Sequence, residues 1–330
     1  MARWIAAGLL LIAAAALVAA GAFQYLKIRF ERPGPLAAET VIVIPKGAGL
    51  ASIARQLEAV GIIDDANIFR LGVRFLDLSR SLQAGEFAFV AGITMRETAE
   101  TIAAGKTVLH RLTAPEGETT KAILALLEAT PILTGPVPSS LAEGELLPET
   151  YYFSRGDTRA QVAERMRRSM TELLAELWPE RAEGLPLPTP RSAVILASIV
   201  EKETGLPEER PLIAGVFINR LRKRMRLQSD PTVTYGITLG QAPLGRLLTR
   251  ADLNKPTPYN TYQIDGLPPG PIANPGRKSL EAVLHPTATD YLYFVADGTG
   301  GHAFAKTLKE HQKNVAKWRK VQRSQRSNAD

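Results

Sequence analysis

The sequence predicts an α+β protein with a membrane-spanning helix near its N-terminus. First, Trp4 to Phe23 is an uninterrupted apolar run of about twenty residues, which is the length that an α-helix needs to cross a bilayer. Second, strand-like and helix-like segments follow one another without the regular alternation of a βαβ array. Third, 330 residues are too many for one small core, so two or three domains are expected.

The apolar run is expected to be an uncleaved anchor. A cleaved signal peptide is the alternative, because Ala19, Ala20 and Gly21 imitate a small-residue cleavage site. The apolar core of a signal peptide is typically about 7–15 residues long, so the length here favours an anchor, and so do the flanking aromatic residues Trp4, Phe23 and Tyr25. Charge does not fix the orientation, since basic residues flank the run on both sides: Arg3 before it, and Lys27, Arg29 and Arg32 after it.

A Pro- and Gly-rich linker at residues 32–35 leads into a small predicted unit of about 65 residues. Its pattern is strand, helix, helix, strand, helix, at residues 39–47, 53–60, 65–76, 82–89 and 94–104. The last helix opens on a capping box formed by Thr94 and Glu97.

The rest of the chain predicts a larger α+β body. Its expected elements are strands at 108–113 and 291–295 and helices at 119–130, 161–178, 192–205, 210–222 and 307–322. Residues 231–286 are rich in Pro, Gly, Tyr and Asn with little periodicity. A long irregular stretch inside a domain is typical of a binding cleft or lid.

The stretch from Ser192 to Gly205 predicts a buried helix that ends in a carboxylate. Its aliphatic residues lie on several faces, as in a helix inside a domain. Thr189 and Pro190 suit its N-terminus, and Gly205 suits its end. A carboxylate at such a helix end is partly desolvated, which is how proteins prepare a general acid. Glu201 is the candidate, with the alternative that it only ends the helix in solvent.

Two further segments complete a candidate site for cleaving sugars. A turn carries Gln228, Ser229 and Asp230, and a loop carries Tyr259, Asn260 and Tyr262. Carboxyl groups protonate glycosidic oxygens, amides bind N-acetyl and hydroxyl groups, and aromatic rings stack on sugar faces. Each residue has a structural alternative: capping for Asp230, packing for the tyrosines, and satisfying backbone groups for the amides. Asn219 and Glu143 are candidates for holding or lining the cleft.

At these residues the chain resembles a known family. ILASIVEKETG, AGVFINRLRKRMRLQSDPTVTYG and YNTYQIDGLPPGPIANPG are similar to motifs of the MltG (YceG-like) family of membrane-anchored endolytic murein transglycosylases. LQAGEFAF with GITMRETAETIAAGK resembles the LysM-like subdomain of that family, and EGELLPETYYF another of its segments. More distantly, IVEK, MRLQSDP and YNT resemble motifs of lysozyme-like lytic transglycosylases, although Lys202 stands where those enzymes have Ser.

The resemblance implies a fold and a domain order. We expect a membrane anchor over residues 1–32, a small LysM-like α/β subdomain over 33–106, a YceG-like α+β catalytic domain with a lysozyme-like cleft over 107–322, and a basic tail over 323–330. The LysM-like unit either binds glycan or serves as a spacer.

The resemblance also implies a lyase that cuts the β-1,4 bond between MurNAc and GlcNAc within nascent glycan strands, and a role in ending their elongation. Glu201 would protonate the glycosidic oxygen and then act as base, while the MurNAc 6-hydroxyl closes on the anomeric carbon to leave a 1,6-anhydro end. Glu203 cannot share the helix face of Glu201, so the two are a poor acid/base pair. The implied setting is the inner membrane, with the catalytic body on the periplasmic side, and penicillin-binding proteins of the elongation machinery as partners.

The composition narrows the cofactors, partners and functions that are expected. The chain has no Cys and four scattered His, so neither a metal nor another cofactor is expected. The net charge of +7 would suit nucleic acid or an anionic surface, but no nucleic-acid motif accompanies it and no nucleic-acid partner is expected. A hydrolase and a non-enzymatic wall-binding scaffold remain the competing functions.

Overall fold

The computed structural model describes residues 2–327, with side chains described from residue 4 to residue 323. The described chain folds into two compact units. Unit 1 comprises the residues up to His110 together with residues 152–156, and unit 2 comprises residues 111–151 and those from Asp157 onward. The return of residues 152–156 to unit 1 has no signal in the sequence.

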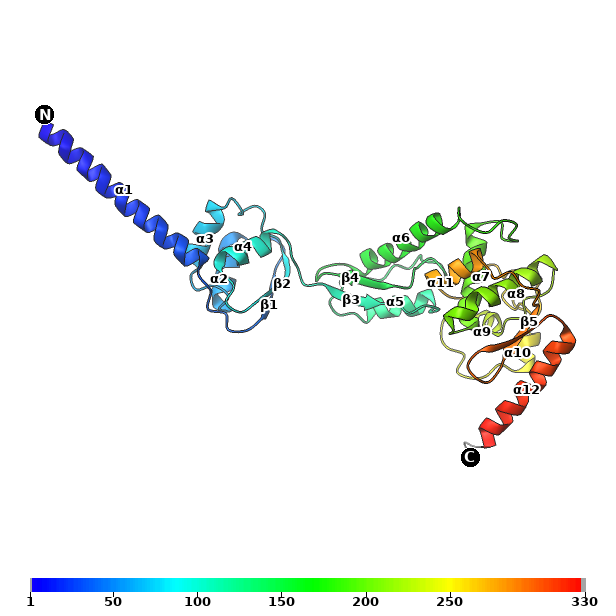
Figure 1. Cartoon of the computed structure of the whole chain (residues 1–330). Helices are drawn as coiled ribbons and strands as arrows, with labels where there is room; N and C mark the ends of the chain where they lie inside the picture. The colour runs from blue at the N-terminus through cyan, green and yellow to red at the C-terminus, as the bar shows by residue number, and fades with distance from the viewer. Residues whose placement is uncertain (1, 328–330) are drawn as a thin grey trace. The chain divides into compact units, whose positions relative to one another are not determined.

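Unit 1 begins with the long helix α1 (Ala2–Glu31), drawn in dark blue in Figure 1. Its stretch from Trp4 to Glu31 is long and apolar enough to cross a membrane, and its most apolar window has no buried residue within the protein. A helix that leaves apolar side chains uncovered fits a single-pass membrane anchor. The end of α1 is different, because the ring of Phe30 is buried in the core of unit 1.

The rest of unit 1 is a small α/β structure whose elements follow the predicted order. Strands β1 (Thr40–Ile44) and β2 (Gly85–Phe89) pair antiparallel, with Ile42 opposite Phe87. Helices α2 (Leu50–Ala59), α3 (Ala66–Phe75) and α4 (Met95–Ala103) supply the other core side chains. The predicted capping box of Thr94 and Glu97 is confirmed at the start of α4.

Unit 2 is mainly helical, and Figure 1 shows the order of its elements in green to red. Within the described chain it holds α5 (Thr120–Glu128), α6 (Arg159–Leu177), α7 (Pro190–Glu203), the 3₁₀ turn η1 (Pro207–Glu209), α8 (Arg210–Arg222), α9 (Asp230–Thr238), α10 (Arg250–Asn254), α11 (Arg277–Leu284) and α12 (Leu308–Ser327). Strands β5 (Tyr293–Ala296) and β6 (His302–Ala305) form a two-stranded sheet in this unit. Strands β3 (His110–Thr113) and β4 (Thr150–Phe153) form another, and the bounds of the two units fall within these two strands.

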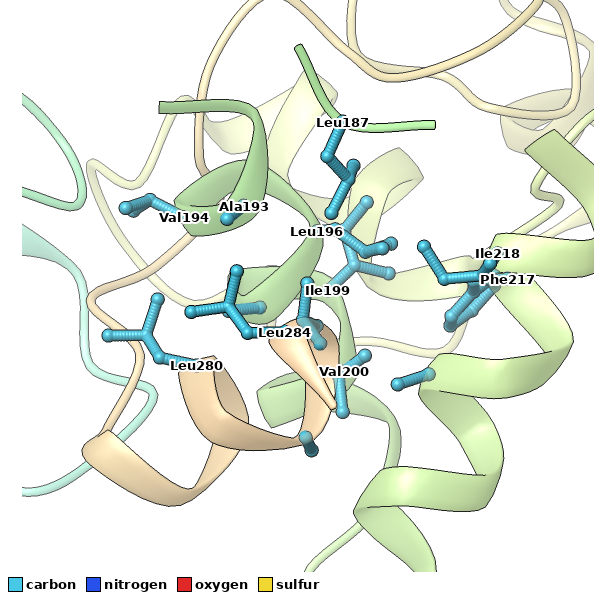
Figure 2. Close-up of a cluster of buried hydrophobic side chains, with 14 of the residues drawn as sticks. Leu187, Ala193, Val194, Leu196, Ile199, Val200, Phe217, Ile218, Leu280 and Leu284 are labelled. Carbon is cyan, nitrogen blue, oxygen red and sulfur yellow. The ribbon is translucent and has the colours of Figure 1, made fainter. Parts of the chain in front are cut away.

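Helix α7 is the centre of the unit 2 core. Every residue from Ser192 to Val200 is buried, and α7 packs against α8 and α11, as the cluster in Figure 2 shows. Its predicted start is confirmed, because Thr189 caps it and Pro190 occupies its first turn. Helix α7 ends at Glu203, and the next residue, Thr204, is extended. A helix held on all sides fixes the direction of the side chains in its last turn.

The stretch of 231–286 is more regular than expected. It contains most of α9 and all of α10 and α11. These helices have five to nine residues, too few turns to show a helical period in the sequence. Helix α10 has a capping box formed by Thr249 and Asp252, a local signal that the sequence analysis did not use.

Candidate active site

The last turn of α7 presents two carboxylates in different directions. Successive residues of an α-helix are rotated by about 100°, so Glu201 and Glu203 point about 200° apart. The structure therefore gives them different neighbours, and those neighbours decide which carboxylate can act as an acid.

Glu201 lies in a buried ion pair. Its side chain is 4% exposed, and its Oε1 accepts a hydrogen bond of 2.7 Å from Arg210, whose side chain is 7% exposed. Its Oε2 accepts the backbone N–H of Gly276 at 3.0 Å. Arg210 also pairs with Glu116 at 3.1 Å. Through these charge-assisted contacts the carboxylate of Glu201 joins α7, α8 and the start of α11.

Glu203 has the environment of a general acid. It is partly buried, and the hydroxyl of Ser229 donates a hydrogen bond to its Oε1. Burial, together with the charge of nearby Asp230, raises the pKa of Glu203 to about 7, although the hydrogen bond from Ser229 and the charges of His302 and Arg220 act in the opposite direction. A carboxyl group with a pKa near 7 can donate a proton at neutral pH and take it back afterwards.

The turn before α9 brings its predicted residues beside Glu203. Ser229 is buried, and its backbone N–H donates to the hydroxyl of Thr261 at 2.9 Å. Gln228 has a left-handed backbone, with φ of 51°, and its N–H donates to the carbonyl of Thr261 at 3.1 Å. A left-handed conformation costs a non-glycine residue about 1 kcal/mol or more. The side chain of Gln228 is exposed and lies outside this turn's backbone contacts.

Three more predicted residues lie around this turn. Asp230 is exposed at the start of α9, and its Oδ1 accepts a hydrogen bond of 2.7 Å from the hydroxyl of Tyr262. Tyr259 packs against Tyr235, with ring centroids 4.8 Å apart. Both tyrosines of the loop are half-buried, so each keeps part of its surface available.

Asn260, by contrast, is too buried to contact a substrate. Its side chain is 0% exposed. Its Nδ2 donates to three backbone carbonyls of residues 252–255, and its Oδ1 accepts the N–H of Tyr262. We therefore correct the expectation for Asn260: it fixes the shape of the loop, which is the structural alternative for an amide in such a position.

Asn219 and Glu143 are also occupied by structural contacts. The Nδ2 of Asn219 donates to the carbonyls of Thr289 and Tyr291 at 2.7 and 3.2 Å. The Oε1 of Glu143 accepts the N–H of Thr120 at 2.7 Å, and its Oε2 accepts the hydroxyl of Tyr235 at 3.3 Å. Burial raises the pKa of Glu143. Glu143 thus fixes the position of the Tyr235 hydroxyl.

A groove of about 640 Å³ lies within unit 2 beside this constellation. Lys202 and Asp230, the sequence neighbours of Glu203 and Ser229, line one part of it, and Tyr235, Thr119 and Gln241 line another. Its size is in the range of small-ligand sites. No group of three or more His, Asp or Glu side chains able to hold a metal ion occurs in the part of the chain that the structure describes.

Comparison with known proteins shows which family the chain resembles. The model of the YceG-like family matches residues 42–317. The endolytic murein transglycosylase of Bacillus subtilis (strain 168) is 32% identical, over 92% of this chain and 91% of that protein. The endolytic murein transglycosylase of Streptococcus pneumoniae serotype 2 (strain D39) is 30% identical over 83% of this chain, which spans 57% of that protein.

A solved structure is also similar to this chain. The crystal structure of a yceG-like protein from Listeria monocytogenes shares 32% sequence identity, with a TM-score of 0.51, and the match covers 84% of this chain and 99% of that one. The matched region includes α7, the turn before α9 and the tyrosine loop. The chain belongs to the YceG-like family.

Proposed function

We propose that the chain is an endolytic murein transglycosylase, a lyase that cuts peptidoglycan glycan strands without consuming water, and that Glu203 is its proton donor. Two relatives that it matches at 30–32% identity carry that name. The observation that carries the proposal is the carboxyl of Glu203, which has a pKa of about 7 and accepts a hydrogen bond from Ser229, whose sequence neighbour Asp230 lines the groove. From the sequence alone Glu201 is the expected proton donor, but its pairing with Arg210 favours a structural role.

A single carboxyl group is enough for this reaction. Protonated Glu203 gives its proton to the oxygen that links MurNAc to GlcNAc, and the bond from that oxygen to the anomeric carbon breaks. The 6-hydroxyl of the same MurNAc forms a new bond to the anomeric carbon and loses its proton to the Glu203 carboxylate, which regenerates the acid. Hydrolases of the two-carboxylate kind need a second group for water or a covalent intermediate, whereas here the substrate supplies the nucleophile.

The surrounding residues have roles in binding. We assign the amide of Gln228 and the hydrogen-bonded pair of Asp230 and Tyr262 to the N-acetyl and hydroxyl groups of the glycan, and the ring of Tyr259 to a sugar face. Ser229 orients Glu203. The finer proposals are that the groove acts as a lysozyme-like cleft and that unit 1 is a LysM-like module.

The cellular setting follows from the substrate. We propose that α1 anchors the chain in the inner membrane with unit 2 on the periplasmic side, where murein is assembled, and that penicillin-binding proteins of the elongation machinery are partners. The apolar surface of α1 supports the anchor.

Product analysis tests the activity. The full-length chain, incubated with purified sacculi, should release fragments that end in 1,6-anhydro-MurNAc and are one water lighter than hydrolysis products in mass spectrometry. Reducing MurNAc ends would refute the lyase and favour a hydrolase, and intact sacculi would favour a wall-binding scaffold.

The pH dependence of cleavage should follow Glu203. Because the reaction needs the protonated acid and the pKa of Glu203 is about 7, kcat/KM should fall about tenfold per pH unit above neutrality. The measurement is the rate of anhydro-end formation from sacculi between about pH 5 and pH 9. A rate that stays constant across pH 7 would contradict the assignment.

Removing the side chain of Gln228 should weaken substrate binding without harming the fold. Gln228→Gly keeps the left-handed backbone that glycine adopts freely and deletes the amide, so kcat/KM should fall about tenfold, the worth of one hydrogen bond. Arg224→Gly is the matched control, because Arg224 is also exposed and has φ of 54°. Equal activity of the two variants would exclude the side chain of Gln228 from the binding site.

A further inference from the structure

An apolar patch on unit 1 is left uncovered beside the end of α1. In α3 the side chains of Leu71 and Phe75 are 51% and 72% exposed, and they lie one helical turn apart on one face. With Phe23 and Leu26 of α1 they line an apolar pocket of about 500 Å³. An exposed patch of this kind marks an interaction surface.

The patch is continuous with the membrane-spanning part of α1. The ring of Phe75 packs edge-on against the ring of Phe23, with centroids 5.4 Å apart. Phe23 ends the apolar run of about twenty residues, which places it near the boundary between hydrocarbon and headgroups. Phe75 therefore lies at the same depth whenever α1 spans the bilayer.

The position of α3 is fixed by a close contact with α1. A Cβ atom on Gly72 would lie 2.3 Å from the buried ring of Phe30, so glycine is needed here for the helices to meet. Arg29 of α1 and Arg32, the residue just after that helix, both pair with Asp64, just before α3. The patch and the anchor thus move as one body within unit 1.

The charges around the patch suit lipid headgroups. Lys27, Glu31 and Arg96 line the pocket, and Arg96 pairs with Glu31 at 3.1 Å, so that Lys27 supplies the unpaired charge there. Arg74 lies on α3 one turn from Leu71. Lys27 and Arg74 form no ion pair with any described side chain. Basic side chains at the ends of apolar surfaces reach toward headgroup phosphates while their aliphatic stems stay in the interface.

We propose that α3 is a second membrane contact: its Leu71 and Phe75 lie in the interfacial layer of the bilayer that holds α1, the apolar pocket takes lipid acyl chain, and Lys27 and Arg74 meet phospholipid phosphates. The inference rests on the proposed anchoring by α1. It makes unit 1 a module bound to the membrane surface at two points.

Single cysteines test the proposal, because the chain has none of its own. Full-length Phe75→Cys and Leu71→Cys carry a nitroxide label in nanodiscs of phosphatidylethanolamine and phosphatidylglycerol, at one chain per disc. Leu11→Cys, within the apolar run, is the lipid reference, and Val90→Cys, at a 63% exposed position of unit 1, is the aqueous reference. Each label is read by its accessibility to oxygen, which concentrates in lipid, relative to a water-soluble nickel chelate.

The expected result is an oxygen-to-nickel ratio at positions 71 and 75 several-fold above that at position 90 and closer to that at position 11. Ratios at 71 and 75 equal to that at 90, with position 11 still in lipid, would overturn the second contact and leave the anchor intact. An aqueous reading at position 11 as well would overturn both. Shielding of positions 71 and 75 from both reagents would show a protein surface over the patch and exclude lipid as its occupant.

Discussion

Replacing Glu203 with Gln should lower the rate of glycan cleavage about 10²- to 10⁴-fold, the range expected for loss of a general acid. The amide keeps the size of the side chain and can still accept the hydrogen bond from Ser229, but it has no proton to give. The measurement is the rate of anhydro-end formation by the full-length chain at about pH 6, where the wild-type acid, with its pKa of about 7, is mostly protonated.

The folding stability of Glu203→Gln distinguishes a catalytic role of Glu203 from a structural one. Burial raises the pKa of Glu203 above its ordinary value of 4.5, so the folded state favours the protonated form and loses stability as the pH rises from that ordinary value through 7. Glu203→Gln removes this penalty. The variant should therefore be at least as stable as the wild type above pH 7, and a large loss of activity cannot be assigned to unfolding.

Glu201→Gln is the matched variant, two residues away on the same helix. It should reduce the stability of unit 2, because Arg210 loses its closest partner and keeps only Glu116. Its rate, measured on folded protein, should stay within about tenfold of wild type. The reverse pattern, with Glu203→Gln active and Glu201→Gln inactive, would make Glu201 the acid, as the sequence analysis expected.

These two glutamates show which features of the site the sequence predicts and which it does not. The sequence predicts the buried helix, its cap at Thr189 and a carboxylate at its exit, because capping residues and apolar composition are local signals. It does not tell Glu201 from Glu203, since that choice depends on which side of the helix faces Arg210 and which faces Ser229. Both partners come from later segments of the chain and are set by tertiary packing.

The same limit applies to the two loops of the site. The sequence predicts that Gln228, Ser229 and Asp230 lie together, because they are neighbours in one turn. It could not separate Asn260, which is fully buried, from the half-buried Tyr259 and Tyr262, since burial in an irregular loop has no period to read. A cluster of Asn and Pro in a loop is a signal for backbone bonding as much as for a ligand.

Removing Arg210 should destabilise unit 2 by about 3–5 kcal/mol, the usual cost of leaving a buried charge without its partner. Arg210→Met keeps the aliphatic volume but leaves the 4% exposed carboxylate of Glu201 with only the N–H of Gly276. Urea unfolding of the full-length chain in detergent micelles measures the change, through the fluorescence of Trp178, which packs against the unit 2 core.

The double variant decides between loss of the ion pair and loss of packing. In Arg210→Met/Glu201→Gln no charge is left in the pair, and the amide oxygen can still accept the Gly276 N–H. Its free energy of unfolding should therefore lie well above that of Arg210→Met alone, by about 2 kcal/mol or more. If the two variants are equally unstable, the guanidinium acts through packing, and Glu201 is not held as a buried charge. In that case the ion pair with Arg210 no longer separates Glu201 from Glu203 as the candidate acid, and the activities of Glu203→Gln and Glu201→Gln alone decide between them.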